Sequence, residues 1–486
     1  MTSSDVMGNQ LHLSVLSQDD ISAIHLASLD ILERTGVFVE LPEVREMLRG
    51  AGANTAGERV RVPSFLVENA LRSAPHRVTI GNRDGEPYLF LEGNRSYFCG
   101  ITDCPQVLDP LTRSRRSFTS KDYALTARVI DACPHLWGGG AGGSASDYPP
   151  EVRCQVAFKY SMLDTKKPFM SCPLNAQQMA DVYDMAAVMA GGYDKLRQAP
   201  FIIATAEPVT PLGLFKDATE ILLLAAHQGM PLVWYPMPSA GTTAPCSPAG
   251  LLAIGNAEVL AGLVVHQLAG RGAPFIYGTM PGMTDLRGSV TQWAYGSPDL
   301  ALLAAAATDM AHSYGLPMYG TAGCSDAWCV DQQAVAEATI LCTLAQLSGA
   351  NLVHDVGVLA GAVLVSPEMM VVCDEVLDMV EHATHRVDTS HEEMAVELIQ
   401  EVGPRGNYLA TDHTLANFRR FWYPRVFQRV RLTAEAAEEP ETVADRISRK
   451  TVQVLETHKV QPLPEETMRE LADMETGWMA RAGYAR

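Results

Sequence analysis

The chain has 486 residues, of which 47% are hydrophobic and 19% charged, and its formal net charge is −19. This length and composition exclude a disordered chain and allow either one large barrel with terminal additions or two to three ordinary domains. Nucleic acids and anionic membranes require basic surface patches, so we expect neither among the partners. The acidic balance is compatible with a cationic or zwitterionic substrate.

The start of the chain, its cysteines and its most apolar stretch indicate a compartment. The first ten residues are mostly polar and contain no Lys or Arg, which does not match a signal peptide. Ten cysteines are scattered without regular spacing, as small core residues in a reducing environment are. Residues 251–268 are apolar but are interrupted by Asn256, Glu258 and His266, so they predict a buried helix and not a membrane span. We therefore expect a cytoplasmic protein.

Residues 1–92 predict an α-rich N-terminal segment. Ser17 supplies a helix cap before apolar residues that recur at helical spacing from Ile21 to Ile31. Residues 36–39 and 60–62 are typical of short strands, and Pro63 ends the second strand and begins a further helix. We expect this segment to be a cap or an interface element for the domain that follows.

Residues 93–385 contain eight short apolar runs, most of which follow a Pro or Gly and end in small or polar residues. The runs lie roughly 30 to 45 residues apart, which is the length of one strand, one helix and two loops. They occupy residues 97–100, 136–139, 168–171, 200–204, 231–235, 274–278, 317–320 and 350–354. Eight such units predict a closed (β/α)8 TIM barrel, an α/β fold whose chemistry lies at the C-terminal ends of its strands.

Helices are predicted between these runs and after them. Gly-x-Pro sequences at 229–231 and 315–317 each stop a helix and precede a strand, as αβ loops of parallel sheets do. Residues 367–379 predict the eighth helix of the barrel. Residues 386–486 predict a C-terminal helical extension that packs outside the barrel or between subunits, so we expect a homo-oligomer.

Aromatic residues gather at the predicted strand ends and in the loops behind them, although they make up only 7% of the chain. Aromatic faces attract a quaternary ammonium by cation–π interaction, by roughly 0.5 to 2 kcal/mol per ring once water is excluded. The simpler interpretation is that inward aromatics fill the barrel, but as a group they favour a cation-binding pocket. The candidates are Tyr97, Phe98, Trp137, Trp234, Tyr235, Tyr277, Trp293, Tyr295, Tyr319 and Trp328.

Two polar residues close predicted strands. His354, followed by Asp355, ends the eighth strand, where a histidine can bind a substrate carboxylate or move a proton. Glu207 ends the fourth, where it can balance a positive charge or act as a base. Each also has a structural interpretation, as a buried histidine or a loop-fixing carboxylate. The cysteine pairs at 99/104 and 324/329 lack partners at metal-binding spacing, so we expect no metal site.

Eight segments, spread over about residues 20–430, form a specific set although each alone is ordinary. They are Ile31–Val37, Thr243–Pro245, Asn256–Gly262, Gly320–Gly323, Ser325–Ala327, Asp331–Ala334, Ser348–Leu352 and His413–Leu415. Together they resemble the trimethylamine methyltransferase family of corrinoid-dependent methyltransferases. The resemblance implies a barrel that binds a methylated amine and presents one N-methyl group to a cobalt(I) corrinoid on a separate protein.

The resemblance also narrows the substrate and the cofactor. Family members that act on trimethylamine carry pyrrolysine, whereas this chain has standard residues throughout, which points to the subgroup resembling glycine betaine methyltransferases. A quaternary ammonium already carries a neutral leaving amine, so neither zinc nor a special electrophile is required. The chain has no Asp-x-His-x-x-Gly corrinoid signature, so we expect no tightly bound cofactor, with cobalamin supplied by a partner corrinoid protein.

These implications assign roles to named residues. Glu207 and His354 are the expected catalytic residues, and His354 is also expected to bind the substrate carboxylate. The expected ammonium-binding residues are Tyr97, Phe98, Tyr235, Tyr277, Tyr319 and Trp328. The alternatives are a methyltransferase for another betaine such as carnitine or proline betaine, a non-catalytic betaine-binding barrel, and an unrelated barrel lyase or isomerase that uses His354 and Glu207 as acid and base.

Overall fold

The computed structural model describes residues 11–100, 103–140, 142–287, 292–429 and 441–484. Its centre is a sheet of eight parallel strands in the order β10-β11-β13-β15-β18-β19-β6-β9. In chain order the strands are β6 (Tyr97–Gly100), β9 (Leu136–Gly139), β10 (Phe169–Ser171), β11 (Ile202–Ala206), β13 (Leu232–Trp234), β15 (Phe275–Gly278), β18 (Met318–Thr321) and β19 (Leu352–His354). The N–H of Gly139 donates to the carbonyl of Pro168 over 2.9 Å, which brings β9 to the start of β10 and nearly closes the barrel. The predicted TIM barrel is confirmed, because each apolar run forms one of its strands.

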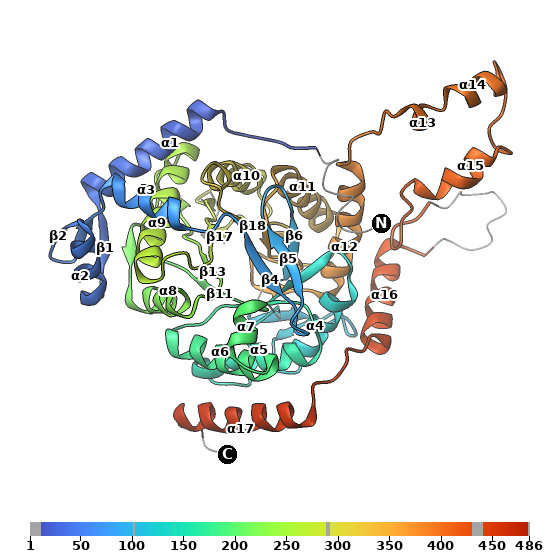
Figure 1. Cartoon of the computed structure of the whole chain (residues 1–486). Coiled ribbons are helices and arrows are strands. Elements are labelled where there is room, and N and C mark those ends of the chain that lie inside the picture. Colours follow the sequence, from blue (N-terminus) through green and yellow to red (C-terminus); the bar gives the residue numbers. More distant parts are fainter. Residues whose placement is uncertain (1–10, 101–102, 141, 288–291, 430–440, 485–486) are drawn as a thin grey trace.

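A major helix follows each strand, and these helices surround the barrel (Figure 1). They are α4 (Asp122–Ala132), α5 (Arg153–Leu163), α6 (Ala176–Ala190), α8 (Lys216–Gln228), α9 (Pro248–Ala269), α10 (Pro298–Ser313), α11 (Gln332–Ser348) and α12 (Pro367–Ala383), with the short α7 (Tyr193–Gln198) after α6. Side-chain caps begin several of them; the Asp331 carboxylate, for example, accepts from the N–H of Ala334 at the start of α11. Gly349 ends α11 at φ +77°, where a side chain would meet Asn94.

The N-terminal end of the barrel is closed by a hairpin. Strands β4 (Val78–Gly81) and β5 (Pro87–Leu91) pair antiparallel, and Ile80 and Leu89 are fully buried. The apolar side chains of the hairpin pack against the inward side chains of the barrel strands, in a cluster separate from the core between strands and helices. The inward residues of that cluster are Tyr97, Cys99, Met170, Ile203, Val233, Ile276, Tyr319 and Leu352. A ligand therefore enters from the C-terminal end of the strands.

The rest of the N-terminal segment packs on one side of the barrel. It consists of α1 (Gln18–Asp30), a π-helical turn (Ile31–Thr35), β1 (Val37–Val39), α2 (Pro42–Ala51), β2 (Asn54–Ala56), β3 (Arg59–Arg61) and α3 (Ser64–Ser73). The strand β1 pairs in parallel with β12 (Gly213–Leu214), which belongs to the loop after β11. The carboxylate of Asp309 accepts from the N–H groups of Val15 and Leu16 over 2.7 and 2.8 Å, which fixes the chain before α1 against α10.

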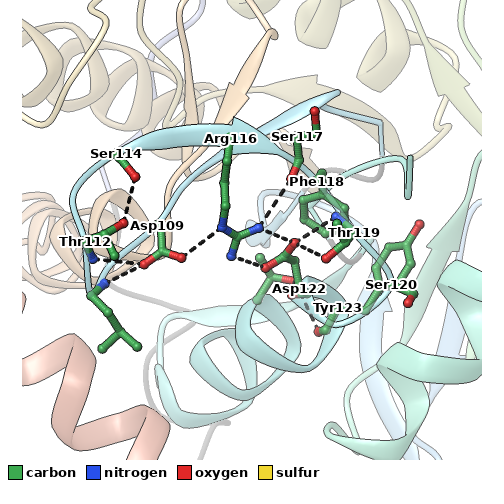
Figure 2. A network of polar contacts seen from close by, with 12 residues as sticks. Asp109, Thr112, Ser114, Arg116, Ser117, Phe118, Thr119, Ser120, Asp122 and Tyr123 are labelled. Carbon is green, nitrogen blue, oxygen red and sulfur yellow. Dashed lines mark hydrogen bonds and ion pairs between the residues drawn. The ribbon is translucent and has the colours of Figure 1, made fainter. Parts of the chain in front are cut away.

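The loops at the barrel mouth form two small sheets. One joins β14 (Ser239–Ala240), β16 (Gly282–Asp285) and β17 (Gln292–Trp293), and the other joins β20 (Val358–Leu359), β21 (Leu364–Val365), β7 (Gln106–Leu108) and β8 (Arg115–Ser117). Figure 2 shows the polar contacts that brace β7 and β8. The Arg116 guanidinium donates to Asp109 over 2.9 Å and to both oxygens of the buried Asp122 over 2.7 and 2.6 Å. These bonds tie the loop after β6 to the start of α4.

The helix α9 is the one candidate in the described residues that is long and apolar enough to cross a membrane. Within its 18-residue window, 78% of the residues are buried inside the protein. It also carries the fully buried Asn256, whose side-chain oxygen accepts from the Tyr277 hydroxyl over 3.0 Å. The helix packs as part of the layer around the barrel.

The C-terminal region has two parts of different character. The segments α13 (His391–Met394), α14 (Val396–Val402) and α15 (Asp412–Asn417) contain no buried residue and form an arm that projects from the body (Figure 1). The helices α16 (Val443–Thr457) and α17 (Glu465–Arg481) return to the barrel. There the Lys159 ammonium on α5 lies 2.5 Å from the Glu475 carboxylate on α17.

Candidate active site at the barrel mouth

A cavity of about 70 Å³ lies at the C-terminal ends of the barrel strands. Its walls come from six strands or the residues directly after them, and from the loops after β13 and β15. The lining residues are Gly100, Asp103, Met170, Cys172, Glu207, Tyr235, Met237, Met280, Tyr295, Tyr319, His354 and Asp355. This is the end of the barrel at which the fold positions its chemistry.

Two tyrosine rings and one imidazole form a connected wall of the cavity. The Tyr235 and Tyr319 rings lie 5.4 Å apart at an interplanar angle of 61°, and the Tyr319 ring stacks on His354 with centroids 4.2 Å apart. Burial raises the pKa of both phenols well above the ordinary value, so both rings stay neutral. Neutral rings present the electron-rich faces that attract a cation.

The side chain of His354 is buried, and one nitrogen of its ring is hydrogen-bonded to the backbone. Its Nδ1 lies 2.7 Å from the carbonyl oxygen of Gly320, and because a carbonyl only accepts, Nδ1 carries the proton. Burial lowers the pKa of His354 to about 4, so the imidazole is neutral near pH 7. A neutral histidine offers no positive charge to a substrate carboxylate, which removes the physical basis for that expected role.

The side chain of Asp355 is the least satisfied group in the cavity. Its exposed fraction is 1%, its φ is +78°, and neither carboxylate oxygen has a hydrogen-bond partner among the described residues. One oxygen lies 3.2 Å from Nε2 of His354. Burial, and then the charge of Asp103, raise the pKa of Asp355 well above its ordinary value. A buried acid without a donor, on a strained backbone, is typical of a site completed by a ligand.

Glu207 adds a third carboxylate to the same cavity. The loss of surrounding water, and then the charge of Asp103, raise the pKa of Glu207 to about 7, although its side chain still faces open space. Among the described residues that line the cavity there is no Lys or Arg. Three carboxylates and two electron-rich rings around one small volume select a positive charge.

The structure brings four of the expected residues together and moves two others to the outside of the barrel. Glu207, Tyr235, Tyr319 and His354 line the cavity. Phe98 and Tyr277 belong to the core between strands and helices, and neither belongs to the lining of the cavity. Side chains alternate along a strand, so the inward neighbours of Phe98 are Tyr97 and Cys99. The expectation that Phe98 and Tyr277 bind the ammonium is corrected.

Tyr97 and Trp328 also lie away from the cavity, for different reasons. Tyr97 points inward but stands at the start of β6, near the closed end, where its hydroxyl accepts from the N–H of Phe90 over 3.3 Å. Trp328 is 64% exposed, and the Arg115 guanidinium lies 4.9 Å from the centroid of its ring. Both are corrected as ammonium-binding residues. Of the other candidate aromatics, Tyr295 lines the cavity.

Sequence reasoning missed several lining residues. Asp103 follows β6 by three positions, and a carboxylate in the loop after a barrel strand is the signal that could have identified it. The cavity is also lined by three methionines, Met170, Met237 and Met280. In the sequence they look like ordinary core residues, so no pattern distinguishes them from residues that pack inside the barrel. Within the described residues no group of three or more His, Cys, Asp or Glu side chains is arranged to hold a metal ion.

A family model and two sequence relatives agree on one family. A family model described as trimethylamine methyltransferase (MTTB) matches residues 2–478. The chain is 29% identical to trimethylamine methyltransferase MttB of Desulfitobacterium hafniense (strain DSM 10664 / DCB-2), over 93% of this chain and 92% of that protein. It is 31% identical to the glycine betaine methyltransferase of Desulfitobacterium hafniense (strain Y51), over 88% of this chain and 90% of that protein. Among solved structures, the monomethylamine methyltransferase (MtmB) of Methanosarcina barkeri aligns with 98% of this chain and 96% of its own, at 11% identity and a TM-score of 0.48.

Proposed function

The chain belongs to the trimethylamine methyltransferase (MTTB) family, whose members act on methylated amines, and we propose that it transfers a methyl group from a quaternary amine to the cobalt(I) corrinoid of a separate partner protein. One observation carries this proposal. The mouth cavity combines three carboxylates with the faces of Tyr235 and Tyr319 and contains no basic residue in its described lining. A permanent cation is the ligand that this combination stabilises best.

The proposed reaction is an in-line displacement at one N-methyl carbon. The carbon–nitrogen bond breaks, its electron pair leaves with the amine, and the carbon bonds to the cobalt of the partner. Because the leaving amine is neutral, the chain supplies no proton to it. The contribution of the chain is to orient the ammonium and exclude water, and positioning alone can lower a barrier by about 7 to 11 kcal/mol.

Within this proposal each polar lining residue has a role. Burial raises the pKa of Glu207, Asp355 and Asp103, and a bound cation favours their charged forms, which then balance its charge. His354 positions the Tyr319 ring by stacking on it. The imidazole itself is held by Gly320.

Glycine betaine is the first substrate to test, because sequence analysis favours it and a relative of that name is 31% identical. Carnitine and proline betaine are the alternatives. The decisive assay is methyl transfer from each quaternary amine to Co(I) cobalamin, followed by the change in the cobalamin absorption spectrum. Transfer from at least one of them supports the proposal. Tight binding without any transfer supports a non-catalytic betaine-binding barrel, and no binding at all favours an unrelated barrel enzyme.

We also propose that the chain forms a homo-oligomer in the cytoplasm. The arm formed by α13 to α15 and the residues after them up to Phe421 buries none of its own residues, yet it exposes large apolar side chains such as Leu409, Leu415 and Phe421. Contact with a second copy of the chain would remove these apolar side chains from water, which is favourable. The cytoplasmic setting is supported by the absence of a disulfide among the ten cysteines, all of which lie in the described residues.

A further inference from the structure

A second cavity, of about 160 Å³, adjoins the mouth cavity. The two share Asp103 and Cys172 as wall residues. The second cavity lies against the outward-facing side of β10, where Phe169 and Ser171 point, and is enclosed by α5 and α6. We call it the side chamber. A ligand larger than the mouth cavity has this space directly beside it.

The side chamber contains what the mouth cavity lacks, a basic residue. Arg153 is half-buried at the start of α5, and its Nε donates to the carbonyl of Tyr148 over 3.0 Å. Among the described residues it forms no ion pair, neither with Asp103 nor with any other carboxylate. In a chain with 56 acidic and 37 basic residues, a half-buried arginine that lines a cavity and forms no ion pair is unusual, and Asp103 is the one carboxylate in the described lining of this chamber.

Two other polar side chains of the side chamber, Gln178 and Ser171, already have hydrogen-bond partners. The Gln178 amide donates to the Pro150 carbonyl over 3.1 Å and accepts from the N–H of Leu174 over 2.8 Å. The Ser171 hydroxyl lies 2.9 Å from the Cys154 sulfur. Arg153 uses Nε for its bond to Tyr148, so its two terminal nitrogens are charged donors for a ligand in this chamber.

We propose that the substrate is a betaine whose carboxylate binds Arg153 in the side chamber while its ammonium occupies the mouth cavity. This inference rests on the proposed function and narrows its substrate class. In glycine betaine a single methylene separates the two charges, so its carboxylate lies beside Asp103, Glu207 and Asp355, which repel it. A longer chain carries the carboxylate past Asp103 and Cys172 to a guanidinium that binds it through two parallel hydrogen bonds.

The test is a calorimetric binding series with trimethylammonio carboxylates that contain one to four methylenes, together with tetramethylammonium as a ligand without a carboxylate. We expect the affinity of the wild-type chain to be highest with three or four methylenes. Arg153→Met should weaken the binding of these long betaines by about tenfold or more, because a charged hydrogen-bond pair is lost. The same variant should leave the affinity for tetramethylammonium unchanged.

Two further variants control for folding and for charge. Arg153→Lys keeps the charge but loses the paired geometry, so it should restore only part of the affinity for long betaines. Ala157→Leu fills the side chamber from α5, one helical turn after Arg153, and leaves the guanidinium in the chain; it should exclude long betaines while tetramethylammonium still binds. Thermal unfolding of each variant establishes that it is folded.

Different outcomes overturn different claims. If glycine betaine binds most tightly, or if neither Arg153→Met nor Ala157→Leu weakens the long betaines, the side chamber is not the carboxylate site, although the mouth cavity still is a cation site. If tetramethylammonium and every betaine fail to bind the wild-type chain, the proposed function fails, and the assignment of Arg153 fails with it.

Discussion

At the scale of a single residue, Glu207 should make the affinity for a cation depend on pH. Its pKa is raised to about 7, so between pH 6 and pH 8 the carboxylate changes from mostly neutral to mostly charged. A cation prefers the charged form, so its affinity should increase by about tenfold over this range. His354 does not contribute, because its pKa of about 4 keeps it neutral throughout.

Calorimetric titration of tetramethylammonium at several pH values measures this dependence. Glu207→Gln is the matched variant, since it keeps the shape of the side chain and removes the charge. It should bind at pH 8 about as the wild-type chain binds at pH 6. Asp103 and Asp355 face the same cavity, and their deprotonation changes affinity in the same direction. A wild-type affinity that stays constant from pH 6 to pH 8 would remove Glu207 from the site.

Tyr235 offers the clearest test of the aromatic wall, because it is only half-buried and directly follows strand β13 at the cavity. Tyr235→Leu removes the π-face and should weaken ammonium binding about three- to thirtyfold, whereas Tyr235→Phe should keep most of the affinity. Tyr277→Phe is the control: it loses the hydrogen bond to Asn256 and should cost about 1 kcal/mol of unfolding free energy without changing affinity. Equal binding by the Leu and Phe variants of Tyr235 would contradict the cation–π interaction.

At the scale of elements, the strands of the barrel could be predicted from the sequence, but the phase of their side chains could not. Pro or Gly punctuation and apolar runs mark where each strand lies. A shift of one residue decides whether a side chain faces the barrel interior or the helices. Buried strands of three to five residues are apolar on both faces, so the sequence does not show which face is which. Phe98 and Tyr277 were misplaced for this reason. Tyr97 was misplaced by depth: it stands at the start of β6, and the apolar run does not show that the preceding hairpin of β4 and β5 folds over that end of the barrel.

The residues that sequence analysis placed correctly share a property. His354 and Glu207 are polar and stand where a strand ends, so their position along the strand, and not its phase, brings them to the mouth. The rest of the cavity depends on long-range packing. Met237, Met280 and Tyr295 come from loops after β13 and β15, whose paths are fixed by pairing in a small sheet that no local pattern reveals.

The brace around Arg116 should stabilise the loop that carries Asp103. Arg116→Met leaves the buried Asp122 without its guanidinium partner, so we expect unfolding free energy to fall by about 2 kcal/mol, between the values for exposed and buried ion pairs. The control is Arg49→Met, whose pair with Glu46 is more than half exposed and should contribute under about 1 kcal/mol. Urea denaturation measures both. Equal losses for the two variants would show that the brace does not stabilise this loop.

At the scale of the whole molecule, the projecting arm predicts that copies of the chain associate into an oligomer. Leu409, Leu415 and Phe421 are 82%, 75% and 77% exposed in one copy, and a self-associated chain should bury them. Sedimentation velocity should therefore show an oligomer that dissociates when all three are replaced by Ser. Replacing Leu26, which is 63% exposed on α1, is the control and should leave the sedimentation coefficient unchanged. A monomeric wild-type chain would show that the arm has another partner.

The whole molecule also directs the ligand to one end. A hairpin fills the N-terminal end of the barrel, the loops at the C-terminal end form two small sheets, and the carboxylates line the cavity at that end. Ligand selection therefore depends on one property of the mouth cavity: it recognises a permanent positive charge, not merely a trimethyl group of the right shape.

Calorimetry with choline and 3,3-dimethylbutan-1-ol tests that claim most directly, because the two ligands have the same shape and differ only in the charged nitrogen. At pH 8 choline should bind at least about tenfold more tightly, through the rings and carboxylates of the mouth cavity. Equal affinities, or tighter binding of the neutral alcohol, would contradict the account.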